Sequence, residues 1–216
     1  MAARKMQIDF VSDVVCPWCA VGLASLETAL QRLEGEVSAD IQFQPFELNP
    51  DMAPEGEDRD EHLAKKYGRS KADFAASRET IRQRAAAVGF TMNAQDRIYN
   101  TFDAHRLLHW AGAAGKAPQA ALKHALLKAY FTDGLDISNA DVLVAKAEQV
   151  GLDPKEARAI LASDRYAADV KQEEQAWLAA GINSVPAIIV NRKYLISGGQ
   201  PPEVFEASLR EMAQEN

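Results

Sequence analysis

The residues with the clearest chemical potential are two cysteines in the sequence Cys16-Pro17-Trp18-Cys19, which are the only cysteines of the chain. A disulfide between them would close a loop too short to restrict the unfolded chain much, so a purely structural role is poorly motivated. Two thiols also fall short of the four ligands of a structural zinc site, and none of the four histidines has ligand spacing to the pair, so no metal is expected. Thiol–disulfide exchange needs a nucleophilic thiolate and a second thiol that resolves the mixed disulfide. Because an isolated C-x-x-C can also be two unreactive thiols, the surrounding pattern decides.

That pattern places the two cysteines between a strand and a helix. Residues 7–15 are rich in β-branched and aromatic side chains, and apolar residues then recur at helical spacing at Leu23, Leu26, Leu30 and Leu33. Pro17 suits the first turn of this helix, whose unpaired N–H groups favour the thiolate of Cys16. Cys16 is therefore predicted to attack and Cys19 to resolve. Trp18 is equally compatible with a place on the rim of the site and with ordinary packing.

The rest of the chain predicts an interrupted domain. A second strand is expected at residues 40–46, followed by a loop at 49–61. Helices are expected from 62 to 180, with N-caps at Ser70, Ser138 and Asp153, then strands at 187–190 and 194–197 and a last helix from Pro201-Pro202. We expect residues 1–50 and 182–216 to form one α/β domain with a single mixed sheet. Residues 51–181 form an all-helical insertion in this prediction, without strands between 62 and 180.

Composition excludes several classes of protein. The chain has 216 residues, of which 47% are hydrophobic and 25% charged, as in globular proteins with a sizeable core. No apolar run is long enough to cross a membrane. A net charge of −7 disfavours binding to nucleic acid, which needs a basic surface. The first residues lack the features of a secretory signal, which predicts a cytoplasmic location.

Four segments together resemble the thioredoxin superfamily, specifically its DsbA-like branch with a helical insertion and, within it, the FrnE-type subgroup. This subgroup is related to 2-hydroxychromene-2-carboxylate isomerases and kappa-class glutathione transferases. The segments are residues 12–19 (SDVVCPWC), 45–50 (PFELNP), 100–106 (NTFDAHR) and 185–202, from Val-Pro to Gly-Gly-Gln-Pro-Pro. The resemblance implies a thioredoxin-like fold. The isomerases have a serine at the position of Cys16, so the cysteine here favours dithiol redox chemistry.

The resemblance also implies further site residues. Val185 and Pro186 match the cis-proline segment that faces the dithiol, where the backbone of the preceding residue pairs with an extended substrate. Asp9 matches a buried acid that takes up the proton of the second cysteine, whereas Asp13 is expected to be a solvated loop residue. His105 and Asn49 are candidates for substrate binding, although a histidine within a helix more often caps or packs.

Three functions follow from these observations. The first is a thiol–disulfide oxidoreductase that acts on protein or small-molecule thiols and disulfides without a required cofactor. The second is a glutathione-using isomerase or transferase in which Cys16 positions the sulfur of glutathione. The third is a chaperone-like binding module with an apolar groove in its insertion. The second thiol favours the first function, with glutathione as a conceivable co-substrate.

Overall fold

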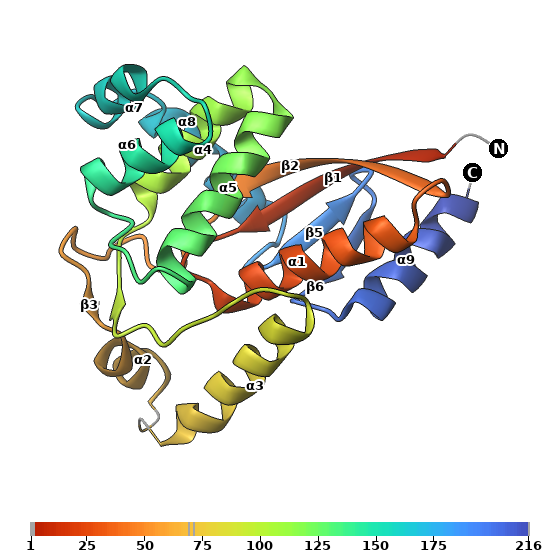
Figure 1. Ribbon diagram of the computed structural model, residues 1–216, viewed down its shortest axis with the longest axis horizontal. Coiled ribbons are helices and arrows are strands. Elements are labelled where there is room, and N and C mark those ends of the chain that lie inside the picture. Colours follow the sequence, from red (N-terminus) through yellow and green to blue (C-terminus); the bar gives the residue numbers. More distant parts are fainter. Residues whose placement is uncertain (1–2, 69, 71, 216) are drawn as a thin grey trace.

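A four-stranded sheet runs through the centre of the computed structural model, which describes residues 3–68, 70 and 72–215. Its strands lie in the order β2-β1-β5-β6 (Figure 1) and are β1 (Arg4–Ser12), β2 (Val37–Pro45), β5 (Ala187–Val190) and β6 (Tyr194–Ser197). β1 is parallel to β2 and antiparallel to β5, which is antiparallel to β6. The two ends of the chain therefore share one mixed sheet, as the sequence predicts.

Two helices pack together on one face of this sheet. α1 (Pro17–Arg32) provides the crossover that parallel β1 and β2 require, and α9 (Pro202–Gln214) lies beside it (Figure 1). Alternate residues of β1 face these helices: Ile8 and Phe10 are fully buried in one cluster with Leu23, Leu26 and Phe205. The leucine pattern of the sequence thus becomes the contact between α1 and the sheet.

The segment between β2 and β5 is mainly helical and leans on the edge strand β2. Its helices α4 (Phe102–Ala114), α5 (Lys116–Phe131) and α8 (Ala167–Ala179) contact β2. The others are α2 (Arg59–Tyr67), α3 (Asp73–Ala87), α6 (Ala140–Gln149) and α7 (Pro154–Leu161). Asp153 caps α7 as expected. The other two predicted caps are wrong: the N-cap of α3 is Ala72 and not Ser70, and α6 is capped by Asn139, one residue after Ser138. Asn139 accepts from two backbone N–H groups, which is why it takes this position.

The prediction that residues 62–180 contain no strand is wrong. β4 (Arg97–Ile98) pairs antiparallel with β3 (Glu57–Asp58), which itself lies in the segment expected to be a loop. α2 also begins within that segment, at Arg59. A strand of two residues is too short to show a periodicity, so the sequence pattern could not predict this pair. At Gly56, where φ is 66°, an added Cβ would lie 2.3 Å from the Ile98 carbonyl oxygen.

Candidate active site

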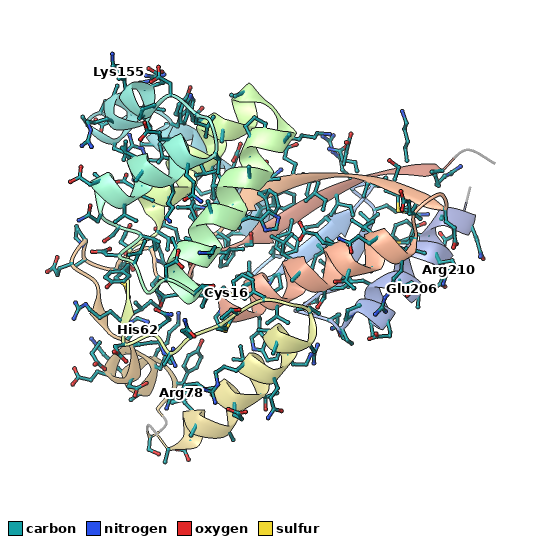
Figure 2. All side chains as sticks on the ribbon, viewed as in Figure 1. Cys16, His62, Arg78, Lys155, Glu206 and Arg210 are labelled. Atoms are coloured by element: carbon teal, nitrogen blue, oxygen red, sulfur yellow. The ribbon has the colours of Figure 1, made fainter. Side chains whose placement is uncertain are left out.

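The two cysteines occupy the first turn of α1, where the central sheet meets the inserted helices (Figure 2). Cys16 is the N-cap residue, with extended backbone, and its carbonyl accepts from the N–H groups of Cys19 and Ala20 at 3.0 and 3.3 Å. Both cysteines are free thiols. Cys16 retains 5% of its surface exposed, whereas Cys19 retains none. Of the two cysteines, only Cys16 is therefore open to solvent, which agrees with the prediction that Cys16 is the attacking thiol.

The environment of Cys19 favours its neutral thiol. Burial raises the pKa of Cys19 well above its usual value, and the hydrogen bond to Cys16 and the charge of Cys16 raise it further. The charge of Lys123 and a backbone hydrogen bond of Asp13 act in the opposite direction without cancelling the effect. Cys19 must therefore lose a proton before it can act as a nucleophile.

The segment before β5 lies against Cys16. The peptide bond between Val185 and Pro186 is cis, which confirms the prediction. The Cys16 thiol donates to the carbonyl oxygen of Val185, with an Sγ–O distance of 3.7 Å. The carbonyl of Pro186 accepts from the N–H of Gly198 at 2.9 Å, which ties this segment to the loop after β6. The backbone of Val185 is thus brought beside the sulfur of Cys16.

A second wall of the site is formed by Trp18, Gly199 and Arg84. An added Cβ at Gly199 would lie 2.7 Å from the backbone oxygen of Trp18, so only glycine permits this approach. Arg84 of α3 donates to the Gly199 carbonyl at 3.0 Å, and its guanidinium carbon lies 5.7 Å from the centre of the Trp18 ring. Trp18 therefore packs and borders the site at once. Nothing in the sequence pattern marks Arg84, because its partners come from two distant segments.

Asp13 is buried, so the expectation of a solvated loop acid is wrong. Its carboxylate accepts from the Leu48 N–H at 2.8 Å and lies 3.4 Å from Nε2 of His105. Burial alone would raise the pKa of Asp13, but the hydrogen bond and charge of His105, together with Leu48 and Lys123, hold it below its usual value. His105 is 2% exposed, so its ring interacts with the Asp13 carboxylate and is hardly accessible from the surface.

Asp9 is buried, as expected, but it does not accompany Cys19. Its carboxylate accepts from the Gln44 side chain at 2.7 Å. Because side chains alternate along β1, Asp9 lies on the face opposite to Phe10 and α1, together with Val11. Asp13, in the loop between β1 and α1, contacts the dithiol through its backbone: its carbonyl accepts from the N–H of Cys16 at 3.3 Å.

Lys123 is a site residue that the sequence analysis missed. It is 1% exposed, and its Nζ has no hydrogen-bond partner among the described residues. Burial lowers the pKa of Lys123, while Cys19, Asp13 and Cys16 act to raise it. The sequence did contain a sign of its burial: Lys123 lies one turn from Leu127 and from Gln119, on the apolar face of α5.

The structure ties the candidate Asn49 to α2. Its side-chain oxygen accepts from Lys66 Nζ at 2.8 Å and lies 3.0 Å from Nε2 of His62. Figure 2 shows His62 among the helices of the insertion. Within the described part of the chain, no group of three or more His, Cys, Asp or Glu side chains is arranged to hold a metal ion.

Two half-buried glutamates lie near Asp13. Burial, the charge of Glu174 and the charge of Asp13 raise the pKa of Glu47 to about 8. Burial also raises the pKa of Glu174. Glu47 lies two residues after the end of β2, in the segment 45–50 singled out from the sequence, and its raised pKa favours the protonated form at neutral pH.

Comparison with known proteins agrees with this geometry. The model of the DSBA-like thioredoxin domain matches residues 7–210. The chain belongs to this DsbA-like family. Proteins of the family are disulfide oxidoreductases or isomerases, so the chain is an enzyme of that type. A probable DsbA oxidoreductase from Streptomyces coelicolor is 33% identical, with a TM-score of 0.90 over 98% of this chain and 92% of the other.

More distant matches include one protein found by sequence and two solved structures. YwbO, an uncharacterised protein of Bacillus subtilis (strain 168), is 27% identical over 94% of this chain and 96% of its own. A 2-hydroxychromene-2-carboxylate isomerase has a TM-score of 0.72 at 16% identity, covering 96% of both chains. The cytosolic disulfide reductase DsbM of Pseudomonas aeruginosa, solved with glutathione, has a TM-score of 0.61 at 17% identity, covering 97% of this chain and all of the other. These two likenesses concern the fold alone.

Proposed function

We propose that this DsbA-like protein catalyses thiol–disulfide exchange with Cys16 as nucleophile and Cys19 as resolving thiol. The asymmetry of the two thiols is the observation that supports this assignment. Cys16 caps α1, retains some exposure and lies beside the backbone of Val185, whereas Cys19 is fully buried and its pKa is raised. A substrate can reach only the first sulfur.

In the reducing direction the exchange has two steps. The Cys16 thiolate attacks one sulfur of a substrate disulfide, which forms a Cys16–substrate disulfide and expels the other substrate sulfur as a thiolate. The Cys19 thiolate then attacks Cys16 Sγ, which forms the Cys16–Cys19 disulfide and releases the second substrate thiolate. Two electrons pass from the dithiol to the substrate, and the reverse sequence oxidises a substrate dithiol. Val185 would pair with an extended peptide on either side of its disulfide.

Reduction of insulin by the purified protein with dithiothreitol tests this function. Turnover is expected for the wild type and should be lost in C16S. Turnover that persists in C16S, or no turnover by the wild type with any protein or small-molecule disulfide, would refute the proposal.

Glutathione belongs to the proposal as a co-substrate and not as a required cofactor. Its disulfide is a small-molecule substrate of the kind that Cys16 would attack, and its thiol could reduce the oxidised dithiol. Incubation of C19S with glutathione disulfide should yield a protein with one glutathione on Cys16, detected by mass spectrometry. Unmodified Cys16 would exclude this role.

The cytoplasmic location expected from the sequence stays a prediction. No helix in the described part of the chain is both long and apolar enough to cross a bilayer. DsbM shows that the same fold serves a cytosolic disulfide reductase. Fractionation of the producing cells, with the redox state of Cys16 and Cys19 trapped by alkylation, would test the location; recovery outside the cytosol would contradict it.

A further inference from the structure

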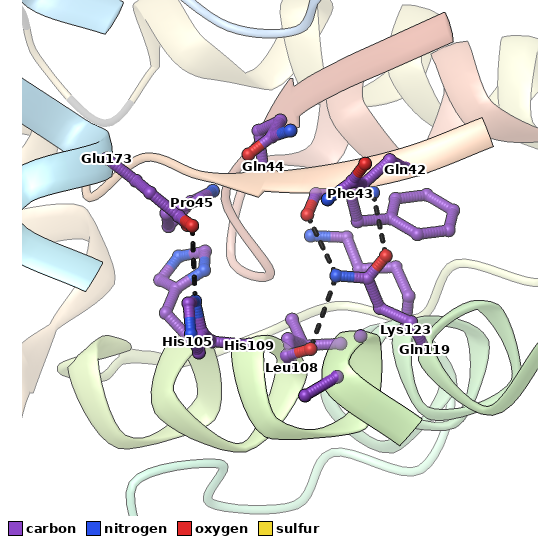
Figure 3. Close-up of a pocket in the computed structure, with 12 residues that line it drawn as sticks. Gln42, Phe43, Gln44, Pro45, His105, Leu108, His109, Gln119, Lys123 and Glu173 are labelled. Atoms are coloured by element: carbon purple, nitrogen blue, oxygen red, sulfur yellow. Dashed lines mark hydrogen bonds and ion pairs between the residues drawn. The ribbon is translucent and has the colours of Figure 1, made fainter. Parts of the chain in front are cut away.

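A cavity of about 230 Å³ lies on the flank of the sheet, between β2 and the inserted helices α4 and α5 (Figure 3). Its wall on the sheet side consists of residues 42–45, and its helical side includes His105, His109, Gln119 and Lys123. The exposed residue Ala113 also lines it, so the cavity reaches the surface there. This volume is large enough to hold several water molecules.

Lys123 lies at the inner end of this cavity. Its side chain extends from α5 toward β2, beside the Gln119 amide that bridges to Phe43 (Figure 3). Nζ lies 5.9 Å from the centre of the Phe43 ring and has no hydrogen-bond partner among the described residues. A buried amine without protein partners needs water for its hydrogen bonds, and the cavity that Lys123 lines has room for it. The amine thus lies between this cavity and the buried dithiol, whose two cysteines act on its charge.

The nearby charged groups leave Lys123 as the available proton acceptor. Those that act on it are Cys16 and Cys19 of α1 and Asp13 of the preceding loop. Asp13 is committed to Leu48 and His105, and His105 of α4 lines the same cavity. His109 is paired with Glu173 at 3.2 Å, where both side chains line the cavity. Burial lowers the pKa of Lys123, which increases the share of neutral amine that can take up a proton.

We propose that Lys123 and this cavity form a proton path between the buried Cys19 and the solvent, separate from the face where the substrate binds. The inference rests on the proposed function of the dithiol. A substrate joined to Cys16 covers the one sulfur that reaches the surface, so the proton of Cys19 needs another way out. The cavity between β2 and the inserted helices α4 and α5 supplies this way out.

The proton and electron transfers balance in the resolving step. The S–H bond of Cys19 breaks, and one bridging water carries the proton to the neutral amine of Lys123, which becomes an ammonium. The Cys19 thiolate forms a bond with Cys16 Sγ, and the Cys16–substrate bond breaks with release of a substrate thiolate. The Lys123 ammonium then returns its proton to water in the cavity. In the reverse direction the ammonium protonates the departing Cys19 thiolate.

Ellman's reagent separates the two steps, because attack by Cys16 releases one thionitrobenzoate and resolution by Cys19 releases the second. We expect K123M to leave the first release unchanged and to slow the second between about tenfold and a hundredfold at pH 7. The wild-type second release should level off with rising pH as Lys123 becomes neutral. In K123M it should instead rise about tenfold per pH unit, since only hydroxide then removes the Cys19 proton. An unchanged second release, or slowing with the wild-type pH profile, would overturn the proposal.

A substitution at the surface end of the cavity tests the same path without changing the buried Lys123. A113F places a ring at the exposed end of the cavity, and A114F places the same ring on the neighbouring exposed residue, which does not line the cavity. The second release should slow at least about threefold in A113F and stay unchanged in A114F. Equal rates in both variants would exclude the cavity as the path. A wild-type protein without the first release would instead refute the proposed function itself.

Discussion

The chemistry of this protein depends on the unequal surroundings of two identical side chains. Cys16 and Cys19 are three positions apart, yet one caps α1 beside the Val185 carbonyl and the other is completely buried. Helix geometry alone places both on one face, so that their sulfurs can join. Their different roles come from what surrounds them: burial raises the pKa of Cys19, and the charge of Lys123 and a backbone hydrogen bond of Asp13 oppose this rise only in part.

Replacing the resolving thiol should trap the intermediate. In C19S, attack by Cys16 succeeds and resolution fails, so a mixed disulfide with the substrate should accumulate. C16S is the matched control and should trap little. Mass spectrometry after incubation with a disulfide substrate measures both, and iodoacetamide labelling near neutral pH should modify Cys16 first. Preferential labelling of Cys19 would reverse the assignment.

At the scale of elements, two contacts hold the site together: the close approach of the loop after β6 to α1, and the cover of the outer edge of β2 by a side chain of α5. The loop after β6 reaches α1 because Gly22 and Gly199 are both glycines: an added Cβ at Gly22 would lie 3.1 Å from Gly199 Cα. The outer edge of β2 is covered by the Gln119 side chain. Its amide accepts from the Phe43 N–H and donates to the Phe43 carbonyl, both at 3.0 Å. A side chain thus continues the sheet where the next strand would be.

Removing this amide should cost stability. Q119L leaves the buried N–H and carbonyl of Phe43 without partners, so the free energy of unfolding should fall by about 2–4 kcal/mol, the cost of two unsatisfied groups. Q83L, at an exposed glutamine of α3, is the control and should change it by less than about 0.5 kcal/mol. Urea unfolding measures both. Equal midpoints for Q119L and the wild type would show that Gln119 does not protect the edge.

A methyl group at Gly199 should displace the wall of the site. In G199A the new Cβ meets the backbone oxygen of Trp18 at 2.7 Å, so the loop or the first turn of α1 must shift. We expect a loss of about 1–3 kcal/mol in stability and slower insulin reduction. S197A, at the exposed last residue of β6 just before this loop, should keep both properties. Wild-type turnover by G199A would mean that this wall does not position the dithiol.

At the scale of the whole molecule, the inserted helices are continuous with the sheet domain. One hydrophobic cluster contains Leu23 and Leu26 of α1 together with Leu107 of α4 and Leu122 and Leu126 of α5. The division into 1–50 with 182–216 and 51–181 stays a prediction. Because the cluster is shared, we expect a single cooperative unfolding transition. Coincident urea curves by circular dichroism and tryptophan fluorescence would agree with this, and two separate midpoints would contradict it.

Stability should fall as pH rises from about 5 to 8. Glu47 has a pKa of about 8 in the folded protein and an ordinary value of 4.5. Between these values the folded state holds a proton that the unfolded chain has lost, so rising pH favours unfolding. E47Q removes this effect and should be more stable than the wild type by about 1–2 kcal/mol at pH 9, since partial exposure screens the charge.

Urea midpoints at pH 5, 7 and 9 measure this dependence. E55Q, on an exposed side chain, is the control and should follow the wild-type curve. A parallel pH dependence for E47Q and the wild type would show that Glu47 titrates normally.

Local pattern was sufficient for the elements that frame the dithiol. The ranges of β5 and β6, the start of α1 at Pro17 and the cap of α7 at Asp153 follow from residue types within a few positions. The cis peptide bond before Pro186 was predicted from the resemblance to a family and not from the residue types themselves.

Only the tertiary structure decided which polar groups serve the site. Asp9 and Asp13 are both aspartates and lie only four positions apart. Strand alternation nevertheless turns Asp9 to the face away from α1, and the loop buries Asp13 against His105. Lys123 is more than a hundred residues from Cys19, and Arg84 reaches Trp18 from another helix. Neighbours along the chain determine helices and strands because backbone hydrogen bonds are local. Burial, charge and proton access depend on segments that meet only when the chain folds, so no local pattern contains them.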